Sequence, residues 1–178
     1  MKILSIFLLL NLVSFARIDS WSTHVNTSDT RDIQIVDENI WCATNGGLLI
    51  FDPKTQTYQK KFIEHGLSGL SIADMEYFDQ TLWVCYENSG TIDVLNQNAE
   101  VIHSYPFEVD GFDRIEQHGD SLWVVFLEET AGLVLFSRID DEWKFRDTFR
   151  NLSADSVISE VHDLKIFGRV HASQNQYY

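Results

Sequence analysis

The chain has 178 residues and a formal net charge of −14, from 13 basic and 27 acidic residues. A surface of this sign repels phosphate groups, so the composition argues against a nucleic-acid partner and, after export, against a membrane partner. The length is sufficient for one domain with its own core.

The first residues have the three parts of a secretory signal peptide. Lys2 gives a positive start, residues 3–13 are almost all apolar, and Ser14 and Ala16 place small residues where signal peptidase cleaves. The apolar run is shorter than the ~20 residues that span a bilayer. We expect residues 1–16 to be removed, the protein to be secreted or periplasmic, and residues 17–178 to form the mature chain. An uncleaved N-terminal anchor is the alternative.

An apolar residue followed by tryptophan recurs along the mature chain. The tryptophans are Trp41, Trp83 and Trp123, at spacings of 42 and 40 residues. A weaker copy places Phe167 at the tryptophan position, 44 residues further on. Regular recurrence at this period is typical of repeat folds.

Each copy has the pattern of four short strands joined by polar turns. The turn after the tryptophan strand contains Gly47, Gly90 or Gly132, which we interpret as supplying the positive φ that tight hairpins need. Four antiparallel strands in ~40 residues are typical of a β-propeller blade. We predict blades at about residues 32–62, 72–105 and 112–149, a partial blade at 156–170 and a stray outer strand at 20–25.

The predicted fold class is therefore all-β, a partial β-propeller of four-stranded antiparallel blades with three full blades and part of a fourth. A β-sandwich is the competing fold, but it does not explain the tryptophan spacing. We interpret the tryptophans as packing wedges between sheets, with a ring of ligand-stacking aromatics as the alternative. A ring needs more blades, so we expect either the N-terminal piece of a longer protein or an open array that self-associates.

The two cysteines, Cys42 and Cys85, lie in similar strands of successive repeats but one residue out of register. Successive residues of a strand point to opposite faces, so the two thiols are expected to point in different directions. We expect two buried thiols, with a disulfide as the alternative.

The repeats resemble the bacterial two-component-regulator propeller family. Its unit has Gly-Leu-Ser, an apolar strand, Leu-Trp-Ile-Gly-Thr, and later Gly-Gly-Leu with Phe-Asp. Residues 65–72 read His-Gly-Leu-Ser-Gly-Leu-Ser-Ile, residues 151–158 read Asn-Leu-Ser-Ala-Asp-Ser-Val-Ile, and residues 40–48 read Ile-Trp-Cys-Ala-Thr-Asn-Gly-Gly-Leu. Cys42-Ala43 replaces Ile-Gly, and the fourth unit lacks tryptophan. The resemblance implies an exported propeller, as in sensor regions of hybrid histidine kinases or in type IX secretion.

No catalytic, metal or cofactor motif is present in the sequence. The acidic pairs at 128–129 and 140–141 lie at predicted turns, where the two adjacent side chains do not face each other across a substrate as glycosidase carboxylates do. We expect a non-enzymatic module without a cofactor that binds an unidentified protein or glycan through the loops at 64–71, 108–113 and 150–156. The alternatives are a sensory region of a hybrid kinase and a fragment of a glycoside hydrolase or lyase.

Overall fold

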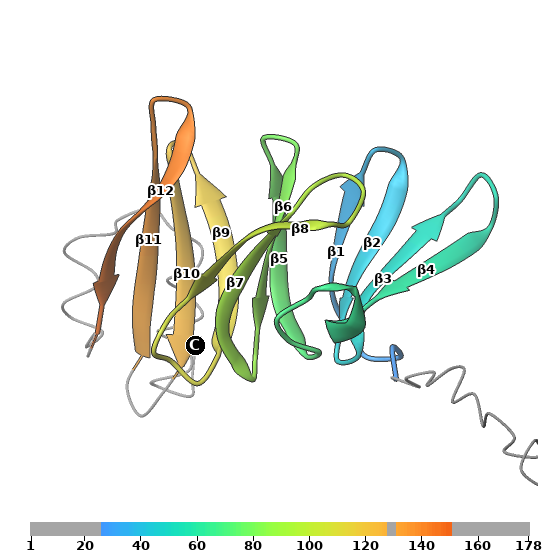
Figure 1. The fold of residues 1–178 in the computed structure, drawn as a ribbon, viewed down its shortest axis with the longest axis horizontal. Helices are drawn as coiled ribbons and strands as arrows, with labels where there is room; N and C mark the ends of the chain where they lie inside the picture. The colour runs from blue at the N-terminus through green and yellow to red at the C-terminus, as the bar shows by residue number, and fades with distance from the viewer. Residues whose placement is uncertain (1–25, 128–130, 151–178) are drawn as a thin grey trace, which may run out of the picture.

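The computed structural model describes residues 26–127 and 131–150, and they form three four-stranded antiparallel sheets side by side (Figure 1). The predicted all-β architecture of propeller blades is therefore confirmed. The predicted signal peptide, the stray strand at 20–25 and the partial blade with Phe167 lie outside the described residues.

The three sheets follow one another along the chain, and in each the strands pair in sequence order. Blade A consists of β1 (Thr30–Val36), β2 (Asn39–Thr44), β3 (Gly47–Asp52) and β4 (Thr57–Lys61). Blade B consists of β5 (Ile72–Phe78), β6 (Thr81–Tyr86), β7 (Ser89–Leu95) and β8 (Val101–Pro106). Blade C consists of β9 (Phe112–His118), β10 (Ser121–Leu127), β11 (Ala131–Ile139) and β12 (Glu142–Phe149). A single 3₁₀ turn, η2 (Ile63–His65), lies between blades A and B.

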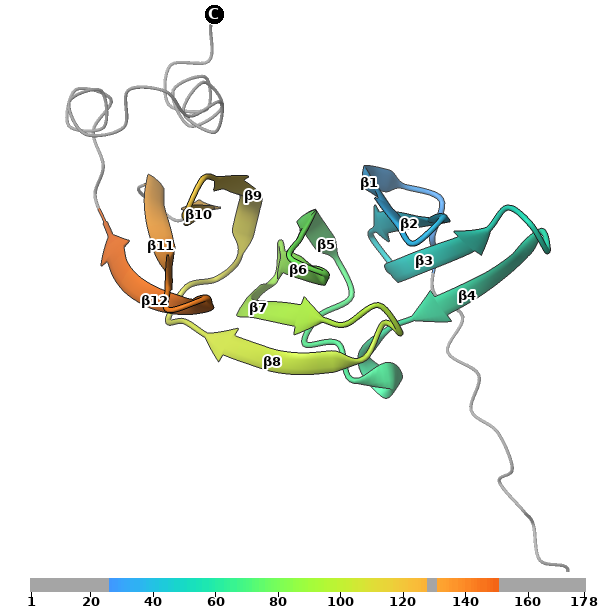
Figure 2. The ribbon, with the colours of Figure 1, turned by 90° about the horizontal axis from the view of Figure 1, so that it is seen from above.

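The blades are arranged as an arc when the molecule is seen from above (Figure 2). The first strands β1, β5 and β9 lie along the inner side of the arc, and the last strands β4, β8 and β12 lie along its outer side. This is how the blades of a propeller surround its axis.

Two apolar clusters fill the spaces between the blades. Trp41 and Leu48 of blade A pack with Met75 and Leu82 of blade B in the first cluster. The second cluster contains Trp83 of blade B, together with side chains of blade C. Blades A and B thus each present a tryptophan to the blade that follows, and both indoles are almost fully buried. Burial of both faces explains why the middle strands are continuous apolar runs.

The turn glycines differ from their predicted role in two of three cases. Gly47 has a φ of +106°, as a tight hairpin requires. Gly90 and Gly132 have no left-handed φ, and the interpretation is wrong for them. A Cβ on Gly132 would overlap the ring of Phe126, and one on Gly90 would overlap the carbonyl oxygens of Val109 and Phe107, so both are glycines because of close packing.

The left-handed turns of the hairpins are made mostly by residues other than glycine. Consecutive positive φ angles occur at three acidic or amide pairs, as type I′ turns require; these pairs are Asp37–Glu38, Asp79–Gln80 and Asp140–Asp141.

The cysteines are both free thiols. Cys85 is fully buried in the second cluster, whereas Cys42 is only half-buried, on the face of blade A that points away from blade B. The expectation of two buried thiols is therefore wrong for Cys42, because no described sheet covers that face.

Candidate functional site

The predicted binding loop at 64–71 is tied into the joint between blades A and B. Leu67 is buried in the first cluster, and the backbone N–H and hydroxyl of Ser68 donate to the carboxylate of Asp93 at 2.7 and 2.8 Å. A Cβ on Gly69 would contact the ring of Tyr86 at 2.7 Å. These contacts leave this part of the loop little freedom to form a ligand site.

The loop at 108–113 is also packed against its neighbours. Phe112 is buried in the second cluster, and a Cβ on Gly111 would overlap the carbonyl of Glu87. Of the third loop, at 150–156, the structure describes Arg150 alone, whose guanidinium lies 5.3 Å from the ring centre of Phe126.

Asp93 is a buried polar hub that the sequence analysis missed. Its side chain is fully buried and also accepts hydrogen bonds from the hydroxyls of Tyr86 and Ser104 at 2.5 and 2.6 Å. A buried carboxylate with four donors is satisfied without a ligand. Burial and the adjacent carboxylate raise the pKa of Tyr86 well above its ordinary value. The hub is structural: it joins the interblade loop to the middle of blade B.

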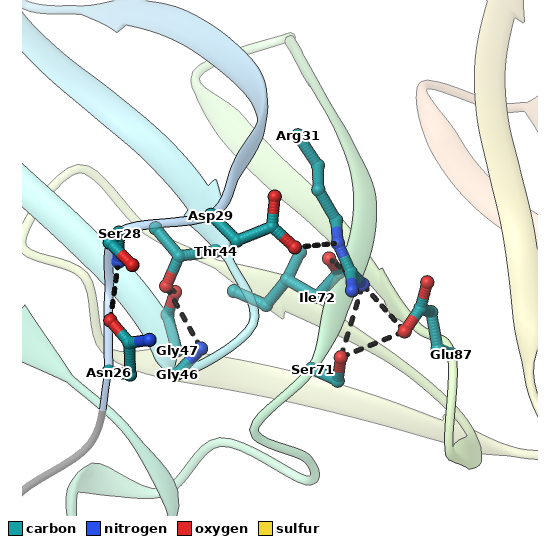
Figure 3. A network of polar contacts seen from close by, with 10 residues as sticks. All are labelled: Asn26, Ser28, Asp29, Arg31, Thr44, Gly46, Gly47, Ser71, Ile72 and Glu87. Atoms are coloured by element: carbon teal, nitrogen blue, oxygen red, sulfur yellow. Dashed lines mark hydrogen bonds and ion pairs between the residues drawn. The ribbon is translucent and has the colours of Figure 1, made fainter.

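A second polar network clamps blade A to blade B at the start of their inner strands (Figure 3). The guanidinium of Arg31 lies 2.7 Å from the carboxylate of Glu87 and donates to the hydroxyl of Ser71 and the carbonyl of Ile72 at 3.1 and 3.2 Å. Asp29 lies 3.6 Å from the same guanidinium. The network is partly exposed, so its energy is modest and sensitive to salt.

The inner strands of the three blades surround a polar cavity of about 380 Å³ on the inner side of the arc. Equivalent positions of β1, β5 and β9 line it in two rows. The rows are Asp32, Asp74 and Arg114, and Gln34, Glu76 and Glu116. The name axial cavity is used for this space.

Acidic groups outnumber basic groups in the axial cavity. Burial is the main cause that raises the pKa of Asp74 to about 6, although the N–H of Ile115 donates to its carboxylate at 3.1 Å. Burial, followed by repulsion from Asp74, raises the pKa of Glu76 to about 7. One oxygen of Glu116 is buried without a hydrogen-bond partner. Within residues 26–127 and 131–150 there is no group of three or more His, Cys, Asp or Glu side chains that could hold a metal ion.

A second cavity, of about 370 Å³, lies in the joint between blades A and B. Asn39, Trp41, Ile50 and Gln59 line it from blade A, and Gln97 and Asn98 line it from the β7–β8 turn of blade B. The name amide cleft is used for this space. Its walls carry primary amides and no charged side chain, so they donate and accept hydrogen bonds without attracting ions.

Trp41 borders the amide cleft with a buried indole N–H that has no hydrogen-bond partner. The N–H of Trp83 also lacks a partner, but its ring is enclosed by Phe78, Tyr105 and Trp143, with ring centres 5.7 to 6.4 Å away. In the joint between blades B and C, aromatic rings thus fill the space beside the tryptophan. In the joint between blades A and B, the space beside the tryptophan is a polar hollow.

The predicted repeat residues occupy different positions relative to these cavities. Trp41 borders the amide cleft, Trp83 lies within the second apolar cluster, and Trp123 is half-buried on the face of blade C that points away from blade B. The three tryptophans do not form a common site. The amide cleft was not predicted from the sequence, because its amide side chains come from turns and strands that are far apart along the chain.

No protein-family model and no curated protein sequence matches the chain. Solved structures do. The extracellular domain of BT3049 from B. thetaiotaomicron, named as part of a hybrid two-component system, has 18% identity and a TM-score of 0.53 over 74% of this chain and 20% of that one. PorZ, a surface component of the type-IX secretion system of Porphyromonas gingivalis, has 15% identity and a TM-score of 0.50 over 71% of this chain and 24% of its own.

The β-propeller domain of Cps50 (Swd1) from Myceliophteria thermophila is similar as well, with 11% identity and a TM-score of 0.51 over 70% of this chain and 41% of that one. The chain therefore spans between a fifth and two fifths of the length of these three structures. These similarities establish the β-propeller fold, and at the level of the fold they confirm the resemblance to propellers of two-component regulators.

Proposed function

We propose that this chain is an exported, non-enzymatic binding module that takes a neutral glycan in the amide cleft. The observation that carries the proposal is the unpartnered N–H of Trp41 beside a cavity lined with amides. Sugar hydroxyls donate and accept hydrogen bonds, and they match amide side chains that do both. Export is supported by the similarity to extracellular domains.

The same walls also suit the backbone of an extended peptide, so a protein ligand is the main competitor. A glycan is favoured because the cleft is a compact hollow lined by two blades, whereas protein interfaces of ordinary size cover larger and flatter areas. Among the described residues no helix is long and apolar enough to cross a membrane.

Screening the purified protein on an array of neutral and charged glycans tests the proposal. Binding of a hit is then measured by calorimetry for the wild type, Gln59→Ala and Gln97→Ala. Each variant removes one amide from the cleft, and we expect each to weaken binding about five- to fiftyfold, the equivalent of one or two hydrogen bonds.

Gln117→Ala is the matched control, because it removes the same side chain from the axial cavity and leaves the cleft intact. Binding unchanged by the two cleft variants, or no glycan hit together with capture of a protein ligand, would overturn the proposal. Hydrolysis of a bound glycan that is lost in Glu76→Gln would overturn its non-enzymatic part.

A sensory role is the second candidate. The similarity to the extracellular domain of BT3049, named as part of a hybrid two-component system, favours it. Sequencing the gene beyond the codon of Tyr178 tests this candidate, since it requires a membrane span and a kinase region downstream.

A further inference from the structure

Blade A has an apolar face that no other described sheet covers. Paired residues of neighbouring antiparallel strands lie on the same face of a sheet, so the strand pairing shows which residues of blade A share this face. They are Ile33, Ile35, Ile40, Cys42, Leu49, Phe51, Tyr58 and Lys60. The name open face is used for these residues. Ile33 is 57% exposed, Ile35 71% and Tyr58 69%, although all belong to regular strands.

Blades B and C show what the open face is built to meet. The residues of blade B that correspond to Ile33, Ile40 and Cys42 are Met75, Leu82 and Val84, which are at most 1% exposed. In blade C they are Ile115, Leu122 and Val124, at most 2% exposed.

In both blades these positions are buried against the preceding blade, on the side where that blade carries its tryptophan. The open face is therefore the receiving half of a blade-to-blade joint. The surface that fits the open face is the tryptophan face of another blade, which is the face that carries the residue equivalent to Trp41.

The same chain carries such a face at its other end. Trp123 and its paired residue Leu135 of β11 are half-buried and correspond to Trp41 with Ile50 and to Trp83 with Val94. On that side of blade C, Val125 and Leu133 are already buried, so the part left partly open is the part around Trp123.

We propose that two copies of this chain associate head to tail, with the open face of blade A in each copy packing against the tryptophan face at the blade C end of the other. A head-to-tail contact between two copies closes when they are related by a half turn about the common axis. The three described blades of each copy then supply six, within the range of natural propeller rings. The pairing removes from water an apolar surface that a monomer leaves exposed.

Sedimentation equilibrium of the purified chain over low to high micromolar concentrations tests the proposal. We expect a dimer for the wild type. Ile33→Lys places a charge at a position whose equivalents in blades B and C, Met75 and Ile115, are almost fully buried in the joint, and it raises the dissociation constant at least about tenfold. Because Ile33 is 57% exposed within one chain, this variant keeps the blade intact. The matched control is Ile102→Lys, on β8, where the isoleucine is 54% exposed but lies outside the open face; it leaves the dimer unchanged.

Two further measurements separate this arrangement from others. Trp123→Lys also breaks a head-to-tail dimer, whereas it leaves intact a dimer that pairs two open faces with each other. Labelling of Cys42 by a maleimide slows as the protein concentration rises, because the joint covers this thiol; Cys85 is buried in either state.

A monomer at all concentrations overturns the proposal. So does a dimer that survives Ile33→Lys, or one that is lost in Ile33→Lys and kept in Trp123→Lys. Each outcome is independent of the amide cleft, so it leaves the proposed glycan binding to its own test.

Discussion

Asp74 in the axial cavity offers a quantitative test of the electrostatics. Its pKa is raised from 3.8 to about 6, mainly by burial. The folded protein therefore binds this proton more tightly than the unfolded chain does. Between these two pKa values the free energy of unfolding falls as the pH rises. Above about pH 6 the folded protein is destabilised by the full cost of burying the ionised carboxylate of Asp74. Two pKa units correspond to about 3 kcal/mol.

Asp74→Asn removes this cost and keeps an oxygen that accepts the hydrogen bond from the N–H of Ile115. The variant also lowers the repulsion that contributes to the raised pKa of Glu76. We expect Asp74→Asn to stabilise the protein by about 1–3 kcal/mol at pH ~8 and by a few tenths at most at pH ~4, where the wild-type carboxyl is already protonated.

Urea unfolding followed by tryptophan fluorescence at several pH values measures the difference between variant and wild type. Asp110→Asn is the control, since it makes the same change of net charge at an exposed loop position. A gain that is equal at low and high pH, or a loss of stability at pH ~8, would refute the electrostatic argument.

Three other variants test the packing and the polar contacts. Gly132→Ala forces a methyl group into the ring of Phe126 and is expected to cost roughly 1–3 kcal/mol; a thermal midpoint equal to that of the wild type would contradict this. Asp93→Ala leaves the buried hydroxyl of Tyr86 and the donors of Ser68 and Ser104 without their acceptor, and is expected to cost roughly 1–3 kcal/mol and to expose the loop at 64–71 to proteases; a loop that stays resistant would contradict the anchoring role of Asp93. Arg31→Ala is expected to cost at most about 1 kcal/mol at low salt, and the cost should shrink in ~1 M salt because the ion pair with Glu87 is partly exposed; a large loss at high salt would show that Arg31 acts through packing.

The fold was predictable because its signal is repeated. Trp41 and Trp83 stand one repeat, 42 residues, apart since each is buried between two sheets, and that burial also makes their strands apolar. The turns were harder to interpret from the sequence. Glycine serves both left-handed φ, as at Gly47, and close packing, as at Gly132, and the residue type does not distinguish the two. Only the position of Phe126 against Gly132 separates them.

The polar features were not predictable, because they depend on contacts between distant segments. Asp93 is a single acidic residue in an apolar strand, which was a signal of a buried network, but its partners are up to 25 residues away. The axial cavity needs β1, β5 and β9 to meet. In β5, the alternation of Asp74 and Glu76 with Met75 was a usable sign that one side of this strand is polar.

The joint between blades A and B is the part of the described chain where structure and proposed function coincide. Arg31 clamps the joint near the start of β1, while Asn39, just beyond the turn that ends this strand, borders the amide cleft. The two features thus lie toward opposite ends of the same interface. A ligand bound to both Gln59 and Gln97 would connect blade A to blade B at the end that Arg31 does not hold. Because the ligand would bind the docked blades and not the separated ones, its binding energy would add to the stability of the joint.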